Sequence, residues 1–209
     1  VEKVVREAPS QIQALIDWGV EFDKNENGEF DLHREGGHSE FRILHHADNT
    51  GAEIQESLIK AVRKHPNITI FDNHFAIEIL TQHHLGIEVT RQTPDIECYG
   101  AYVLDIATNE VHTFLSKVTL MATGGCGAVY KTTTNPLVAT GDGIAMVYRA
   151  KGTVKDMEFI QFHPTALYNP GDRPSFLITE AMRGYGGILR LPNGKEFMHK
   201  YDERLSLAP

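Results

Sequence analysis

The residues best suited to ligand chemistry lie just after residue 117. Lys117–Ala122 is a short, nearly continuous apolar run, which is typical of a strand buried on both faces, and Thr123, Gly124 and Gly125 follow it directly. Ligands of open α/β sheets bind beyond the carboxyl ends of strands, and glycine lets a backbone approach a ligand closely. This position therefore predicts a ligand site, although an isolated Thr-Gly-Gly is more often only a tight turn.

Polar side chains downstream favour the ligand interpretation. Residues 132–135 (TTTN) supply hydroxyls and an amide, and Asp142 stands between two glycines at the start of a helix that we predict over 141–150. A carboxylate there caps the helix or accepts a hydrogen bond from a ribityl or ribose hydroxyl. The two roles are compatible.

Residues 33–51 (HREGGHSEFRILHHADNTG) form the densest polar stretch, and their histidines suggest a metal site at first sight. Those histidines are His33, His38, His45 and His46. They show no i, i+4 pairing beside a glutamate and the cysteines are distant, so the spacing gives little support and we predict no metal. Glu35 and Arg42 could instead face a polar ligand, because Gly36-Gly37 allows the chain to come close to one.

Two further segments suit recognition of a carboxylate. Residues 162–165 (FHPT) and 177–180 (LITE) offer a neutral imidazole and threonine hydroxyls, and Gly184, Gly186 and Gly187 free the backbone that follows. Taken singly, His163 is more often structural, and Thr179-Glu180 is more often a helix turn. Their combination favours a binding role.

Helices and an antiparallel meander must position these residues. Ser10–Trp18 and the segment from Thr50 to Pro66 have amphipathic helical patterns, and Thr50 with Glu53 fits a capping box. We predict further strands at 68–71, 75–80, 87–90, 98–104 and 111–115, of which the last three form a meander. This order implies an α/β layered domain, with a boundary near Met157 where the pattern changes.

Composition excludes several classes of protein. The 209 residues carry 20 Lys and Arg against 28 Asp and Glu, a net charge of −8 that argues against a general nucleic-acid binder. No apolar run approaches the roughly 20 residues of a membrane span, and no secretory signal is visible at the start. Cys98 and Cys126 are expected to be two buried thiols of a cytoplasmic protein.

The order of these motifs resembles the L-aspartate oxidase family, a branch of the succinate dehydrogenase and fumarate reductase flavoprotein superfamily. The motifs are REGGHSEFRILHHADNTG, LMATGG, TTTNP, TGDGIAM, EFIQFHPTALY, LITEAMRG and DERLSLAP. The resemblance runs from about Ile12 to Pro209. FHPT followed by TEAMRG is shared across the superfamily, whereas REGGHS, RILH and DERLSLAP point to the aspartate oxidase branch.

The resemblance implies a FAD-binding, Rossmann-like α/β domain with an inserted antiparallel β-meander. Residues 1–156 would be the later part of that domain, and residues 157–209 would begin an α+β capping domain. Carried over by position, the implied FAD contacts are Phe75 and Ala76 at the adenine end, Thr123, Gly124 and Gly125 along the dinucleotide, and Asp142 on the hydroxylated chain.

The resemblance also implies a reaction, the oxidation of L-aspartate to iminoaspartate on the route to quinolinate and NAD, with O2 or fumarate as acceptor. His163, Thr179 and Glu180 would contact the dicarboxylate, whether aspartate or a fumarate- or succinate-like compound. Glu35 would meet the substrate amino group, where relatives acting on succinate carry Gln. Quinolinate synthase is an implied partner, and the oligomeric state is not indicated.

Two family features are missing from the sequence. None of its 18 glycines forms G-x-G-x-x-G, and the family's proton-transferring arginine, with a later His and Arg, has no counterpart. We therefore expect a central piece of a longer enzyme, inactive by itself. The alternatives are a fumarate reductase or succinate dehydrogenase flavoprotein subunit, against which Glu35 argues, and a non-catalytic binding fragment. Tyr185 stands where relatives often carry Glu.

Overall fold

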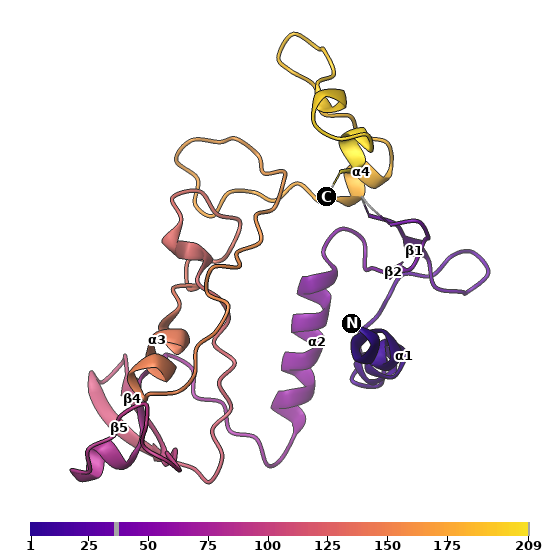
Figure 1. The fold of residues 1–209 in the computed structure, drawn as a ribbon. Helices are drawn as coiled ribbons and strands as arrows, with labels where there is room; N and C mark the ends of the chain where they lie inside the picture. Colours follow the sequence, from indigo (N-terminus) through magenta and orange to yellow (C-terminus); the bar gives the residue numbers. More distant parts are fainter. Residues whose placement is uncertain (36–37, 209) are drawn as a thin grey trace. The chain divides into compact units, whose positions relative to one another are not determined.

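The computed structural model describes residues 1–35 and 38–208, which form two compact units (Figure 1). The first unit contains residues 1–70 and the segment from residue 179 onward, and the second contains residues 71–178. This division follows contacts within the chain. The predicted boundary at residue 156 separates flavin-binding from capping parts, so it stays a prediction.

The first unit contains two long helices and several short elements (Figure 1). Its helices are α1 (Glu2–Asp17), α2 (Thr50–Lys64) and α4 (Ala181–Gly184), its antiparallel strands are β1 (Leu32–His33) and β2 (Ile43–Leu44), and its 3₁₀ turns are η3 (Met198–Lys200) and η4 (Leu205–Leu207). Helix α1 begins well before the predicted Ser10 and continues through Pro9. A proline there removes one backbone donor without ending the helix.

Helix α2 has the predicted bounds, and the residues of its predicted apolar face are half-buried. The predicted capping box is wrong, because Asn49 is the N-cap and makes no side-chain cap bond. The Thr50 hydroxyl instead accepts from the His46 N–H at 3.1 Å. Glu53 accepts from the Glu21 N–H at 3.1 Å, and this bond is the main reason that its pKa is lowered. Both side chains thus tie α2 to the loop before it.

The second unit is built on an antiparallel meander, β3 (His74–Leu80), β4 (Gly100–Asp105) and β5 (Glu110–Leu115), in that order (Figure 1). Helix α3 (Asp142–Arg149) and the 3₁₀ turns η1 (Gln82–Leu85) and η2 (Gly127–Val129) complete it. The predicted meander is confirmed in β4 and β5. Its third strand is β3, however, because residues 87–90 are not a strand, and neither are residues 68–71.

The predicted buried strand over 117–122 is wrong. The segment has no strand assignment, and Val118 and Leu120 are 84% and 87% exposed. A strand forms only where a neighbour supplies ladder hydrogen bonds, and within the described ranges no segment pairs with it. Its apolar pattern is therefore left without a partner.

Burial is modest throughout the chain. The buried apolar residues of the second unit are Ile79, Leu80, Val89, Ala139 and Met146, and those of the first are Val20, Phe22 and Ala208. The prediction of two buried thiols is wrong, because Cys98 is exposed and Cys126 is only half-buried. Cys98 precedes β4, and its sulfur lies 3.3 Å from the Thr119 hydroxyl of the unpaired segment.

Candidate functional site

The turn after residue 122 packs against the start of α3. A Cβ added to Gly143, the second residue of that helix, would collide with the Thr123 side chain. A Cβ on Gly141 would lie 3.0 Å from the Cys126 Cβ. The missing side chains of these two glycines therefore let residues 123–126 lie directly on the helix N-terminus.

The backbone of this turn is open. Gly124 has φ +71°, and neither it nor Gly125 has a heavy atom within 4 Å of the position that a Cβ would take. In the described part of the chain, the N–H groups of Thr123, Gly124 and Gly125 donate no hydrogen bond. Free N–H groups beside a helix N-terminus attract anionic and hydroxylated groups. The residues present thus fit the phosphate and sugar portions of a dinucleotide.

Asp142 is the first residue of α3 and is exposed. It does not cap the helix, because Gly141 is the N-cap with φ +82°. One carboxylate oxygen accepts from the Thr140 hydroxyl at 2.6 Å, and the other has no partner within the described ranges. A carboxylate held in this way can accept a further hydrogen bond from a ligand hydroxyl.

Phe75 and Ala76 lie on β3, an outer strand of the meander, where they oppose Leu104 and Val103. Phe75 is exposed, and the register shifts between Ala76 and Glu78. Arg149 of α3 donates to Glu78 at 2.7 Å and to the carbonyl of Ile77 at 3.0 Å. This bridge joins β3 to α3, so one unit contains all six predicted FAD-contacting residues.

His163 lines a hollow of about 530 Å³ within the second unit. The lining comprises Gly125–Gly127, Tyr130, Thr132–Asn135, Phe159–His163 and Ala166. The Nδ1 atom of His163 lies 2.8 Å from the Thr165 carbonyl and 3.2 Å from the Thr165 nitrogen. Since Nδ1 is engaged, Nε2 is the nitrogen left for a ligand. The structure thus brings His163, Gly125 and the TTTN segment to one cavity.

Glu35 lies at the end of the segment that packs on α4 in the first unit. A Cβ on Gly184 would collide with the Arg34 carbonyl and would lie 3.3 Å from the Glu35 carbonyl carbon. Glu35 is half-buried, and its N–H donates to His38 Nδ1 at 3.4 Å. Gly36 and Gly37, from which we predicted a close approach to a ligand, lie outside the described residues.

Thr179 and Glu180 stand at the start of α4. Glu180 is the N-cap residue, and the Thr179 hydroxyl accepts from the Ala181 N–H at 3.3 Å. Gly184 of this short helix packs on residues 34 and 35. Three of the four predicted substrate-contacting residues, Glu35, Thr179 and Glu180, therefore lie on α4 or next to it.

Sequence reasoning missed Arg183. Its side chain is 6% exposed, its Nη2 lies 3.1 Å from Glu180 Oε1, and its Nη1 donates to the carbonyls of Ser206 and Ala208 at 3.1 and 2.7 Å. The only signal in the sequence was its i, i+3 spacing from Glu180. Tyr185, which the sequence left unexplained, packs edge-on to His33 with ring centroids 5.4 Å apart.

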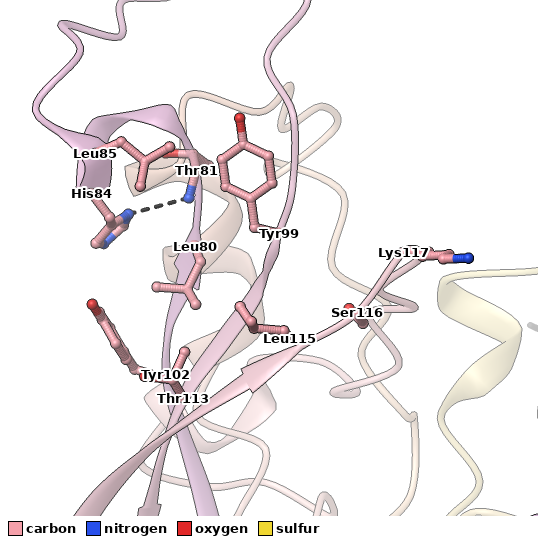
Figure 2. A pocket seen from close by; sticks show the side chains of 10 residues that line it. All are labelled: Leu80, Thr81, His84, Leu85, Tyr99, Tyr102, Thr113, Leu115, Ser116 and Lys117. Atoms are coloured by element: carbon pink, nitrogen blue, oxygen red, sulfur yellow. Dashed lines mark hydrogen bonds between the residues drawn. The ribbon is translucent and has the colours of Figure 1, made fainter.

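A second hollow, of about 600 Å³, lies on the meander (Figure 2). Leu80, Leu85, Tyr99, Tyr102 and Leu115 make its lining largely apolar. Figure 2 marks one hydrogen bond there, from the Thr81 N–H to His84 Nδ1 at 3.2 Å. None of the predicted site residues lines this hollow.

Comparison with known proteins confirms the sequence resemblance. L-aspartate oxidase 2-a of Nicotiana tabacum, a chloroplastic protein, is 51% identical over all of this chain, which covers 32% of that protein. L-aspartate oxidase 1 of Ralstonia nicotianae is 49% identical over 99% of the chain and 38% of its own length. The chain thus spans about a third of the length of the curated relatives it matches.

The fold also has a match among solved structures. A quinol fumarate reductase flavoprotein variant of E. coli superposes with a TM-score of 0.80 and 31% identity, over 94% of this chain and 31% of that one. This likeness supports the coarse fold prediction, a FAD-binding domain that mixes helices with antiparallel sheet.

The prediction of a cytoplasmic protein is wrong as it stands, because the plant relatives are named as chloroplastic. Across the described ranges, no helix has the length and apolar character needed to cross a membrane. The sequence model of the FAD binding domain matches residues 1–208. The chain therefore belongs to the FAD binding domain family, and FAD is its cofactor.

Proposed function

We propose that the whole protein is a FAD-dependent L-aspartate oxidase, which converts L-aspartate to iminoaspartate. The observation that carries the proposal is the hollow of about 530 Å³, which is lined both by His163 and by Gly125 of the turn after residue 122. A group that recognises a carboxylate thus lines the same cavity as a group that approaches the cofactor. The L-aspartate oxidases at 45–51% identity give the reaction.

The finer fold assignment belongs to this proposal. Residues 1–156 are the later part of a Rossmann-like flavin domain with the meander inserted in it, and residues 157–209 begin an α+β capping domain. The change of pattern after Met157 and the family resemblance support this division.

Six residues of the second unit hold FAD in this proposal. Phe75 and Ala76 line the adenine end, Thr123, Gly124 and Gly125 offer free N–H groups to the dinucleotide, and Asp142 accepts from a hydroxyl. When bound, FAD supplies the hydride acceptor for substrate oxidation. The 209 residues contain no G-x-G-x-x-G segment, so we expect this chain by itself to bind no stoichiometric FAD and to be inactive.

In this proposal, the four predicted substrate-contacting residues bind the substrate and hold it in one orientation. In the tautomer whose Nδ1 accepts from the Thr165 N–H, His163 donates from Nε2 to a substrate carboxylate. The Thr179 hydroxyl also donates to a substrate carboxylate. The Arg183 guanidinium, 3.1 Å from Glu180, offsets the charge of Glu180 beside an anionic ligand. Glu35 accepts from the substrate ammonium, which only the amino acid possesses. Holding the substrate in one orientation while a cap excludes water lowers the barrier.

The proposal also includes an electron acceptor and a partner enzyme. O2 or fumarate accepts the electrons, and quinolinate synthase, which would consume iminoaspartate, is the proposed partner. The alternative is a fumarate reductase or succinate dehydrogenase flavoprotein subunit, which the TM-score of 0.80 favours. Glu35 separates the two, because succinate and fumarate have no amino group to bind it. A non-catalytic role is a third possibility, and any turnover of aspartate would contradict it.

The test is Glu35→Gln in the whole protein, which keeps the size of the side chain and removes its charge. A charge-assisted hydrogen bond contributes about 1.5–3 kcal/mol, so kcat/KM for aspartate should fall about 10–100-fold while fumarate reduction and FAD content stay unchanged. Glu40→Gln, an exposed carboxylate of the same loop, is the control and should leave both activities unchanged. Equal loss with both substrates, or no loss, would remove Glu35 from the site.

A further inference from the structure

In the first unit, two histidines and two aspartates come together beside the β1–β2 pair. We propose that Asp31, His33 and His45 bind a divalent transition-metal ion of the Zn²⁺ class, and that Asp23 orients His45. The ligand atoms of Asp31, His33 and His45 all lie within 4.8 Å of one another. The proposal is independent of the aspartate oxidase activity.

The buried imidazole of His45 is the centre of the argument. His45 is only 7% exposed, and neither of its ring nitrogens has a hydrogen-bond partner of acceptable geometry within the described ranges. Buried polar atoms are nearly always satisfied, because an unmet donor or acceptor costs the desolvation of that group. Two such atoms on one ring therefore point to a missing partner, and neutral imidazole is the commonest metal ligand among side chains.

The distances suit one metal ion. The Nε2 atom of His45 lies 3.3 Å from Asp31 Oδ2, and the Nε2 atom of His33 lies 4.0 Å from the same oxygen. Bonds of about 2.0–2.1 Å in a tetrahedral zinc site put neighbouring ligand atoms roughly 3.3 Å apart. To complete the set, the His33 ring would have to turn out of its stack with His45, so that its Nε2 lone pair points at the same ion.

Asp23 is placed to bond to His45 and not to the metal itself. Its Oδ2 lies 3.3 Å from His45 Nδ1 and also accepts from the Ala47 N–H at 2.6 Å. Metal-bound histidines usually donate their second ring nitrogen to such a carboxylate, which fixes the tautomer and the ring orientation. With Nε2 turned to the metal and Nδ1 turned to Asp23, both unsatisfied nitrogens of His45 acquire a role.

A shared proton explains the cluster less well than a metal does. The rings of His33 and His45 are stacked with centroids 3.3 Å apart, so two imidazolium charges would repel each other. A single shared proton sets one positive charge against the two carboxylates of Asp23 and Asp31. A metal ion leaves both rings neutral and supplies the positive charge that the aspartates lack. The side chains of Asp31 and His33 are 53% and 26% exposed, which leaves a path for the ion and an open position for water.

The experiment uses the whole protein, stripped of metal with a chelator and titrated with Zn²⁺ by calorimetry. We expect one tight site per chain. Asp31→Asn should weaken Zn²⁺ binding at least tenfold, and Asp23→Asn should weaken it about 10–100-fold, as loss of an outer partner typically does. His65→Ala, an exposed histidine of the same unit, is the matched control and should bind like the unmodified protein.

Asp31→Asn is the decisive variant, since the Asp31 side chain is half exposed and its loss should leave the fold intact. His33→Ala, checked for FAD content and circular dichroism, is the second test of the ligand set. The proposal is overturned if Zn²⁺ does not bind at one site per chain, or if Asp31→Asn and His33→Ala both bind within tenfold of the unmodified protein.

Discussion

Two regions of the molecule are stabilised by different interactions, one by close backbone packing and the other by charged hydrogen bonds. In the second unit, residues 123–126 lie on α3 because Gly141 and Gly143 have no side chains, and we call this packing the glycine contact. In the first unit, Arg183 joins Glu180 to the carbonyls of Ser206 and Ala208, an arrangement that we call the arginine clamp. Shape fixes the first region, and charged hydrogen bonds fix the second.

The difference teaches which substitutions each region tolerates. The glycine contact has no charge to lose, so a change of volume should break it. The arginine clamp depends on the donors of the buried Arg183 guanidinium, so a loss of donors should break it. Variants that change only volume or only charge therefore separate the two.

Gly143→Ala should have the largest effect, the loss of FAD from the whole protein. The new Cβ collides with Thr123, so the turn must shift away from α3, and overpacking of this kind costs about 1–3 kcal/mol of folding stability. The ratio of flavin to protein and the melting temperature measure both effects. Gly51→Ala, at a helical glycine with open space around it, is the matched control and should keep its flavin. Full flavin content in Gly143→Ala would show that the glycine contact does not shape the cofactor site.

Arg183→Met should break the arginine clamp while it keeps a long apolar stem. Two carbonyls lose a charged donor, so the free energy of unfolding should fall by about 1.5–3 kcal/mol. Arg190→Met is the control, because Arg190 pairs with Glu196 at the surface and such exposed pairs contribute under about 1 kcal/mol. Chemical denaturation of the whole protein measures both changes. Equal losses in the two variants would mean that the clamp adds nothing beyond a surface pair.

His163→Ala tests whether the hollow beside the glycine contact binds substrate. Removal of a charge-assisted donor to a carboxylate should lower kcat/KM for aspartate by about one to two orders of magnitude. His112→Ala, an exposed histidine on β5, should leave the kinetics unchanged. Steady-state kinetics and thermal melts on the same preparations are needed. Lost stability with unchanged kinetics would give His163 a purely structural role.

The glycine contact and the arginine clamp also differ in how far the sequence predicted them. Helix α2 and strands β4 and β5 were predictable, because helical periodicity and short runs of strand-forming residues are local signals. Lys117–Ala122 was mispredicted, since an apolar run indicates burial only if another segment pairs with it. Its neighbour Gly124 was nevertheless recognised as a candidate for close approach to a ligand.

Arg183 and the Asp31–His33–His45 cluster could not be predicted from spacing. Arg183 bonds to residues more than twenty positions away, and an arginine in a short helix is ordinarily solvent-exposed. The histidines show no ligand spacing, because the β1–β2 pairing brings them together across a loop. Contacts of this kind depend on the tertiary fold and leave no periodic signal.

The smallest expected effect comes from an exposed counterpart of the arginine clamp. Arg204 donates to Asp202 through Nε at 2.9 Å and Nη2 at 2.8 Å, and these bonds, with the Arg204 N–H, lower the pKa of Asp202 to about 2. Because the folded pKa is depressed, the pair stabilises the fold above the unfolded value of 3.8, and this contribution is lost as the pH falls through about 2.

Arg204→Gln should therefore raise the pKa of Asp202 toward its ordinary value. The melting temperature of the whole protein should fall only slightly near neutral pH, because solvent screens a pair in which Arg204 is half exposed, and the difference from the unmodified protein should vanish at about pH 2. An NMR titration of the Asp202 carboxyl and melts at both pH values provide the measurements. If this exposed pair proved as costly to break as the Arg183 clamp, burial would not be what makes the clamp strong.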